Sequence, residues 1–205
     1  MTVTEFALLQ LEKGYDEEKL RQALARCRQR QDKWARLVIR SGSDDDDGSL
    51  SSMYLGLFDT SPTLLITAPW DSPEAHADWI RTEENQACNQ ELAEFVQSVE
   101  LCHLEPTGRE KAQLRGPFQP RGVPFSVHQL SVPDDRRDAL AEACRALEET
   151  KEASTRDVMW AGWRLERDHG QSLVVFFTDD VGEEQQRSLI GSCQEAKHGR
   201  FRYVV

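Results

Sequence analysis

The same order of apolar stretches and helical patterns occurs twice along this chain, and this repetition constrains its fold most. In the first half, extended apolar stretches lie at 3–12, 51–58, 63–70 and 98–104. Residues with helical spacing lie between them, at 16–34 and 73–96. In the second half, extended stretches lie at 124–132, 157–165, 172–178 and 201–205, and helical patterns start at 133 and 183. Each half therefore predicts the order β-α-β-β-α-β, which is a ferredoxin-like unit.

The repeat also predicts how the chain divides into domains. Aligning the two element orders places Cys144 over Cys27. The segment between the halves, 106–122, is rich in Pro, Gly, Arg and Gln, which is typical of a linker. We therefore predict a ferredoxin-like domain at 1–105 and a degenerate ferredoxin-like repeat at 123–205.

Several predicted strands are apolar on both faces, as at 6–9 and 173–177. Such strands need cover on both sides of their sheet. Helices can cover one face of each sheet, and the opposite sheet is the natural cover for the other. The sequence thus predicts an α+β fold in which two ferredoxin-like halves pack sheet to sheet as an α+β barrel within one chain. Pairing within the chain makes a monomer plausible, and a homodimer stays open.

Composition narrows the class of protein. A chain of 205 residues with 39% apolar content can bury a sizeable core. The net charge of −11 argues against nucleic acid or an anionic membrane as a partner. There is no apolar run of about 20 residues and no visible secretory signal. The five cysteines form no Cys-x-x-Cys unit, which is typical of buried thiols in a reducing compartment. We expect a cytoplasmic protein.

The segment 70–79 is the most distinctive motif in the chain. Ser72 can cap a helix that follows the strand 63–70, and Pro73 suits the first helical position. His76 and Trp79 are three residues apart and share one helix face, while Trp70 ends the strand. The motif therefore places an imidazole near two indoles at a strand-to-helix junction.

This motif, Trp-x-Ser-x-Glu-x-His-x-x-Trp at 70–79, continues into Glu-Asn-Gln at 84–86. It resembles the antibiotic biosynthesis monooxygenase family of the dimeric α+β barrel superfamily, and most closely its fungal members with tandem domains. The resemblance implies a pocket between sheet and helices for a hydrophobic, often aromatic, small molecule. Many family oxygenases have a histidine near the position of Trp79. The second half reads Thr-Asp-Asp-Val-Gly-Glu at 178–183 instead of the motif, so we expect one site, in the first half.

His76 is the candidate catalytic base. An unperturbed imidazole has a pKa near 6.5, and burial beside aromatic rings keeps it neutral and able to accept a proton. The alternative is a partly exposed histidine at a helix start that does no chemistry. Trp70 and Trp79 are candidate substrate-binding residues that would stack on an aromatic ligand, or else core residues.

Four further side chains complete the candidate substrate-binding set: Tyr54, Asn85, His103 and His128. A polar residue within an apolar strand must find a partner or face a pocket, so His103 and His128 either reach a ligand or have a structural partner. Tyr54 can donate a hydrogen bond to a ligand carbonyl, and Asn85 can orient a polar group. A structural role is the alternative for each.

The chain lacks the spacings of common metal and cofactor sites. There is no His-x-x-x-His or Cys-x-x-Cys unit, so we expect no metal. The acidic run 44–47 lacks the spaced ligands of a calcium loop and is typical of a solvated loop. Gly-rich phosphate loops and nucleophile elbows are also missing, so we expect no cofactor.

The leading hypothesis is a cofactor-independent enzyme of secondary metabolism that acts on a hydrophobic aromatic or polyketide-like molecule. His76 would remove an acidic proton, and the anion would either attack an internal carbonyl or react with O2. A cyclase or isomerase and a monooxygenase are therefore both open. The alternatives are a non-catalytic barrel that binds a small molecule or serves in stress, and a haem-binding protein with a histidine ligand.

Overall fold

The computed structural model describes residues 2–38, 50–57, 61–107, 123–150, 159–166, 171–191 and 193–205. The strands within these ranges are β1 (Val3–Leu11), β2 (Ser52–Gly56), β3 (Thr63–Trp70), β4 (Val96–Pro106), β5 (Phe125–Ser131), β6 (Met159–Arg164), β7 (Ser172–Thr178) and β8 (Gln194–Tyr203). The helices are α1 (Glu17–Val38), α2 (Pro73–Ile80), α3 (Glu83–Leu92), α4 (Arg137–Thr150) and α5 (Glu183–Ile190), with a 3-10 turn, η2 (Asp134–Arg136). The acidic run 44–47 and most of the predicted linker lie outside the described residues.

The strands close into one antiparallel barrel in the order β1-β3-β2-β8-β5-β7-β6-β4. Each half contributes four adjacent strands, β4-β1-β3-β2 and β8-β5-β7-β6, in the same ferredoxin-like order. The two sheets join where β2 pairs with β8 and where β4 pairs with β6. The predicted fold class, an α+β barrel made of two ferredoxin-like halves, is confirmed.

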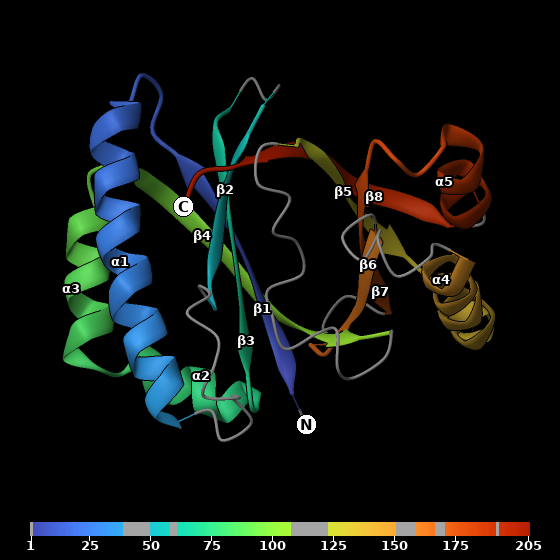
Figure 1. Ribbon diagram of the computed structural model, residues 1–205, viewed down its shortest axis with the longest axis horizontal. Coiled ribbons are helices and arrows are strands. Elements are labelled where there is room, and N and C mark those ends of the chain that lie inside the picture. Colours follow the sequence, from blue (N-terminus) through green and yellow to red (C-terminus); the bar gives the residue numbers. More distant parts are fainter. Residues whose placement is uncertain are drawn as a thin grey trace.

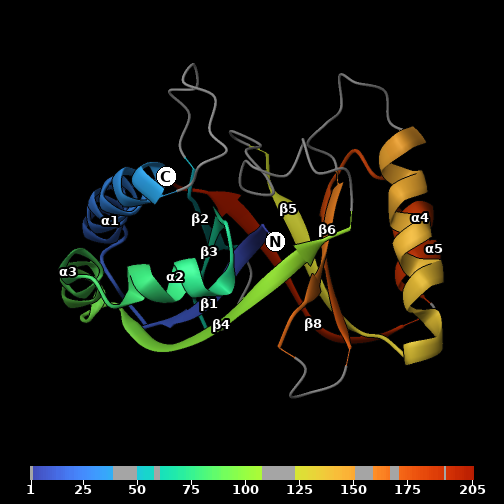
Figure 2. The ribbon, with the colours of Figure 1, turned by 90° about the horizontal axis from the view of Figure 1, so that it is seen from below.

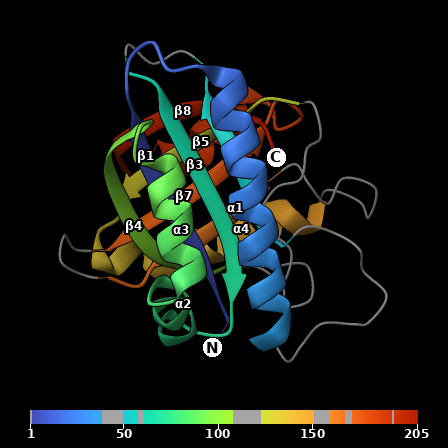
Figure 3. The same cartoon turned by 90° about the vertical axis from the view of Figure 1, so that its left-hand side faces the viewer.

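Helices cover the barrel on two opposite sides. Helices α1, α2 and α3 lie on one side and α4 and α5 on the other, with the strands between them (Figures 1 and 2). Seen from the first side, α1 and α3 run side by side across the sheet (Figure 3). Among the described residues, no helix is long and apolar enough to cross a bilayer.

Aromatic rings fill the inside of the barrel. The ring of Tyr54 lies 4.8 Å from that of Phe125, and Phe176 lies 5.9 Å from Phe125 and 5.3 Å from Trp160. These four side chains belong to one buried cluster that both halves share. Two further clusters lie between the sheet and the helices, one in each half. The barrel interior is therefore a packed core.

Local capping explains where the first-half helices begin. Asp16 Oδ1 accepts hydrogen bonds from the amides at the start of α1. Ser72 Oγ accepts from the Ala75 amide at 3.3 Å, and Pro73 follows as the first residue of α2. Thr82 caps α3 in the same way, so the predicted helical stretch 73–96 is two helices.

The last strand differs from its predicted bounds. Helix α5 ends at Ile190, and β8 begins at Gln194, whereas the sequence predicted the last strand only from 201. Residues 194–200 are mainly polar because much of this part of β8 is exposed, although its backbone pairs with β5. The pattern of apolar residues therefore missed a strand whose backbone hydrogen bonds define it.

Candidate functional site

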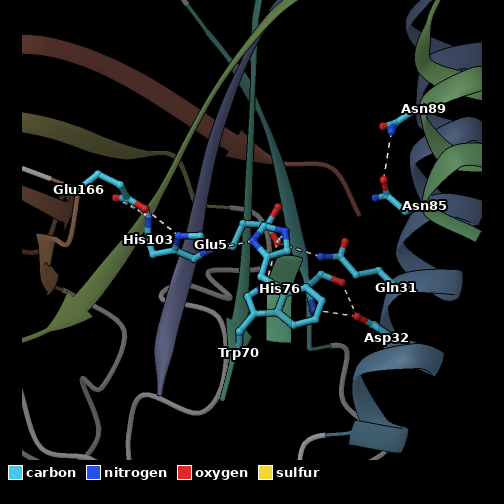
Figure 4. A network of polar contacts seen from close by, with 10 residues as sticks. Glu5, Gln31, Asp32, Trp70, His76, Asn85, Asn89, His103 and Glu166 are labelled. Atoms are coloured by element: carbon cyan, nitrogen blue, oxygen red, sulfur yellow. Dashed lines mark hydrogen bonds and ion pairs between the residues drawn. The ribbon is translucent and has the colours of Figure 1, made fainter. Parts of the chain in front are cut away.

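Four ionisable side chains form a continuous chain of polar contacts at the start of α2 (Figure 4). His76 Nδ1 lies 2.9 Å from His103 Nε2, and His103 Nδ1 lies 2.8 Å from Glu166 Oε1. At the other end, His76 Nε2 lies 3.5 Å from Glu5 Oε2. In the order Glu5–His76–His103–Glu166, two imidazoles lie between two carboxylates. We call this arrangement the histidine relay.

The backbone places three of these groups directly. Glu5 on β1 pairs with His103 on β4, so both side chains lie on the same face of the sheet. Val3 lies on the same face, two residues from Glu5, and it pairs with Trp70 on β3. Because Trp70 packs against Trp34 on α1, this face is the one that the first-half helices cover. The Ser72 cap fixes the start of α2, and His76 then stacks on Trp70 with ring centroids 4.6 Å apart. Sheet register and helix capping thus bring the groups together.

Glu5 is buried, with 6% of its surface exposed, and neutral donors surround its carboxylate. Trp70 Nε1 donates to Glu5 Oε2 at 3.0 Å, and Gln31 Nε2 from α1 donates to the same oxygen at 2.9 Å. With His76, three groups converge on this one atom. The indole that stacks on His76 therefore also binds the carboxylate beside it.

Glu166 closes the other end of the relay from the second half of the chain. It accepts hydrogen bonds from the His103 ring and from the His103 amide, which lies 3.1 Å from each carboxylate oxygen. Burial raises the pKa of Glu166, but these hydrogen bonds lower it more, and the pKa lies below its ordinary value. The Glu166 side chain is 33% exposed, so this end of the relay reaches water.

His76 is the most buried member, with 2% of its surface exposed. Burial lowers the pKa of His76; the Glu5 carboxylate acts in the opposite direction, and His103 adds to the lowering. Its ring is therefore held neutral, as expected for a base that is ready to accept a proton.

The contacts set the number of protons in the relay. Two of the three contacts are hydrogen bonds, and each needs one proton. With Glu166 ionised, His103 donates from Nδ1 to Glu166, and His76 donates from Nδ1 to His103 Nε2. His76 Nε2, which lies 3.5 Å from Glu5 Oε2, is then the nitrogen that can accept a proton. The relay can thus hold a proton and move it between His76 and the exposed end.

The tryptophans of the motif lie in the first-half core. The Trp34 ring, on α1, lies 5.8 Å from that of Trp70 and 5.7 Å from that of Trp79. Trp70 and Trp79 are 0% and 3% exposed, respectively. Both indoles thus pack against Trp34, and Trp70 also contacts Glu5 and His76 of the relay. This packing agrees with the core alternative for Trp79.

Three predicted site residues lie apart from the relay. Tyr54 points into the barrel core, on the opposite face of the sheet from Glu5. His128 lies in the second half, with Nδ1 2.5 Å from Glu195 Oε1 and its ring stacked on His198 at 4.4 Å. Asn85 is on α3. The structure therefore groups His76, Trp70 and His103, and separates Tyr54 and His128 from them.

Asn85 has a structural contact within the helices. Its amide lies 3.1 Å from Trp79 Nε1 and 3.2 Å from the Ile80 carbonyl, and with the amide oxygen toward the indole both hydrogen bonds form. It thereby links the start of α3 to the end of α2.

Sequence reasoning missed Glu5, Gln31 and Glu166. Glu5 carries a signal that was available, because a charged residue inside the apolar run 3–11 needs a buried partner. Gln31 is one polar residue of many on α1. Glu166 follows β6 and reaches His103 only because β6 pairs with β4. No local pattern indicates that contact.

A depression of about 350 Å³ lies away from the relay, between α1 and α3, with Arg26, Gln90 and Glu91 among its lining residues. The part of the chain that the structure describes has no group of three His, Cys, Asp or Glu residues placed to bind a metal ion.

No family model and no curated protein matches this chain. Several solved structures match it in fold. A proposed monooxygenase from Fusobacterium nucleatum subsp. nucleatum superposes with a TM-score of 0.62 at 8% identity, over 100% of this chain and 93% of that one. A proposed monooxygenase from Lactobacillus acidophilus has a TM-score of 0.56 at 10% identity, over 100% and 94%. An anthrone oxidase-like protein has a TM-score of 0.57 at 14% identity, over 100% and 92%. At these identities the likeness shows the fold, the α+β barrel, and no more.

Proposed function

We propose that this protein is a cofactor-independent enzyme of secondary metabolism, of the monooxygenase type, that acts on a hydrophobic aromatic or polyketide-like molecule. His76 is the general base. The observation that carries the proposal is the histidine relay, in which a buried neutral imidazole connects through His103 to the partly exposed Glu166. The fold shared with proposed monooxygenases and an anthrone oxidase-like protein supports the same class.

The relay suits a reaction that begins with removal of an acidic proton. A proton taken by His76 moves along the contact to His103, and Glu166 stabilises the imidazolium that results. Spreading the positive charge toward the exposed end avoids leaving it on the most buried ring. The buried indole of Trp70 holds the His76 ring in place by stacking.

Two outcomes can follow for the substrate anion. In the oxygenase outcome, an anthrone-like CH2 group loses two hydrogen atoms, O2 supplies the new carbonyl oxygen, and the second oxygen atom leaves as water. In the cyclase outcome, the carbanion attacks an internal carbonyl. Both begin with the same proton abstraction, so the first step is the one to test.

Anthrone is a suitable probe, because it contains an acidic CH2 group between two aromatic rings. Exchange of its CH2 hydrogens for deuterium in D2O reports proton abstraction, and O2 uptake reports oxygenation. We expect the wild type to catalyse the exchange and His76→Gln to lose it by about 10²-fold or more. His103→Gln should lower the rate less, because it removes the outlet for the proton and leaves the base.

His128→Gln is the matched control. His128 is also buried and also contacts a glutamate, but it lies in the second half. It should keep the wild-type exchange rate. A folded His76→Gln protein with unchanged exchange would refute the assignment of the base, and exchange without O2 uptake would favour the cyclase outcome.

A non-catalytic binding protein is the first alternative, and it is supported against a catalytic role by the packing of Trp70 and Trp79 on Trp34, which gives these residues of the motif a place in the core. In that case anthrone would change tryptophan fluorescence equally in the wild type and in His76→Gln, and neither protein would accelerate exchange.

Haem binding is the second alternative, and one buried atom favours it. Among the described residues, His128 Nε2 is buried without a hydrogen-bond partner, while Nδ1 contacts the Glu195 carboxylate. A carboxylate on the second ring nitrogen makes an imidazole a stronger metal ligand. Haem would supply redox chemistry at its iron, with His128 as the ligand. Haemin titration tests this: a Soret shift in the wild type that His128→Gln abolishes supports it, and no shift refutes it.

A further inference from the structure

Two thiols face each other between the first-half helices. Cys27 on α1 and Cys88 on α3 are 4% and 5% exposed. Cys27 Sγ lies 3.9 Å from the Cys88 carbonyl oxygen, and Cys88 Sγ lies 4.0 Å from the Cys27 carbonyl oxygen. The two side chains also hydrogen-bond to each other. Each sulfur is therefore directed at the other residue, across a contact between helices that run side by side (Figure 3).

A guanidinium distinguishes the two sulfurs. Arg30 Nη1 donates to Cys88 Sγ at 3.9 Å, and Glu91 holds Arg30 in place through an ion pair at 2.5 Å. The hydrogen bond from Cys27 lowers the pKa of Cys88, and with the contribution of Arg30 it falls to about 7 despite burial. The hydrogen bond to Cys88, together with burial, raises the pKa of Cys27. The pair thus consists of one sulfur that readily becomes a thiolate and one that stays a thiol.

The surface depression between α1 and α3 lies beside this pair in the sequence of both helices. The depression between α1 and α3 is lined by Arg26, which precedes Cys27, and by Glu91, which follows Cys88 by three residues. By contrast, Cys102 lies in the barrel core, where burial raises its pKa to about 12. Position and charge therefore single out Cys88 over Cys102 as a nucleophile.

We propose that Cys27 and Cys88 are a redox-active dithiol that hydrogen peroxide converts into a disulfide between α1 and α3. The Cys88 thiolate attacks one peroxide oxygen, the O–O bond breaks, and the hydroxide released takes up a proton to become water. This leaves a sulfenic acid on Cys88. The Cys27 sulfur then attacks the Cys88 sulfur, and the sulfenic hydroxyl leaves as water with the proton from Cys27. In sum, two thiols lose two protons and two electrons, and one peroxide becomes two waters.

The bond would link the redox state to the histidine relay. Gln31, which donates to Glu5, lies one helical turn beyond Cys27 on α1. A covalent link between α1 and α3 would therefore hold the helix that positions Gln31. The dithiol chemistry itself does not depend on the proposed function.

Mass spectrometry of the full chain tests the proposal. The reduced protein is treated with hydrogen peroxide at pH 7, denatured, alkylated and digested. We expect a Cys27–Cys88 cross-linked peptide that is lighter by two hydrogen atoms than the sum of its parts and that reappears as two alkylated peptides after reduction. Glutathione added to the same tube is the positive control for oxidation. If glutathione is oxidised while both cysteines are alkylated to the same extent with and without peroxide, the proposal is overturned.

Two variants test the order of attack. In Cys27→Ser the sulfenic acid on Cys88 has no thiol to resolve it, so dimedone should label Cys88 at least about tenfold more than Cys102. In Cys88→Ser, Cys27 should remain unlabelled; labelling of Cys27 there would overturn the assignment of the nucleophile. Cys102→Ala is the control and should form the Cys27–Cys88 disulfide at the wild-type rate. Because the wild-type mapping needs no variant, a variant that fails to fold leaves the test intact.

Discussion

Replacing Glu5 with leucine removes the carboxylate on which three groups converge. Leucine has a similar size and suits the apolar surroundings, so the change leaves the shape of the site nearly intact. It deprives Trp70 Nε1 and Gln31 Nε2 of their acceptor, and both groups remain in the buried region between sheet and helices. His76 Nε2 also loses its neighbour.

The expected cost follows from the stranded donors. A buried donor without an acceptor costs about 1–3 kcal/mol, so the two side-chain N–H groups together cost about 2–6 kcal/mol. Burying leucine in place of a carboxylate recovers about 1–2 kcal/mol. We therefore expect Glu5→Leu to lower the free energy of unfolding by about 3 kcal/mol. For a chain of this length that lowers Tm by about 6–12 °C.

Urea denaturation followed by circular dichroism measures this loss as a lower midpoint with an unchanged slope. Glu12→Leu is the matched control, since Glu12 is exposed and its hydrogen bond from Gln97 is at the surface; we expect a change within about 0.5 kcal/mol. The double variant Glu5→Leu/Gln31→Leu should cost less than the sum of its single changes, with a coupling of about 0.5–3 kcal/mol.

A Glu5→Leu protein as stable as the wild type would refute this reasoning, because it would mean that neither donor depends on the carboxylate. Strict additivity in the double variant would show that Gln31 and Glu5 act independently. Either result would contradict the role of the Glu5 carboxylate in holding the buried end of the histidine relay.

The remaining predictions concern pH and packing. Burial lowers the pKa of His76 and His128 in the folded state, so the unfolded chain binds more protons below about pH 6.5. The free energy of unfolding should fall as the pH drops from 7.5 to 5.5, by at most about 1.4 kcal/mol per unit for each histidine; a slope that stays unchanged in both His→Gln variants would contradict this. Gly162→Ala places a Cβ 2.5 Å from Trp160 and 2.9 Å from Leu104, and should cost about 1–3 kcal/mol in urea denaturation. A Gly162→Ala protein with an unchanged free energy of unfolding would show that Trp160 and Leu104 can shift to make room for the added Cβ.

The sequence predicted best those elements whose signals are local. The bounds of β3 and β7 agree with the predicted stretches, because each strand has an apolar run with turn residues at its ends. The start of α2 was readable because a cap acts within one helical turn, as Ser72 does on Ala75. The first part of β8 was not readable, since what defines it is backbone pairing with β5.

Only part of the candidate site could be predicted from the sequence. The sequence singled out His76, Trp70 and His103, which the structure brings together, since alternation along a strand and spacing along a helix determine which face a side chain occupies. It also grouped Tyr54 and His128 with them, although the closed barrel places these two on other faces. Face and element were predictable; which faces meet was not.

What the sequence by itself determined is the order of elements in each half, and with it the α+β barrel. Capping, turns and apolar alternation act between residues a few positions apart, so they can be recognised in the sequence without knowing the tertiary structure. Only the tertiary structure decided the partners. Glu166 meets His103 across 63 positions and Cys27 meets Cys88 across 61. A buried charge or thiol must find its partner wherever barrel closure and helix packing bring one within reach, and that is a property of the register between strands and helices, which no local pattern carries.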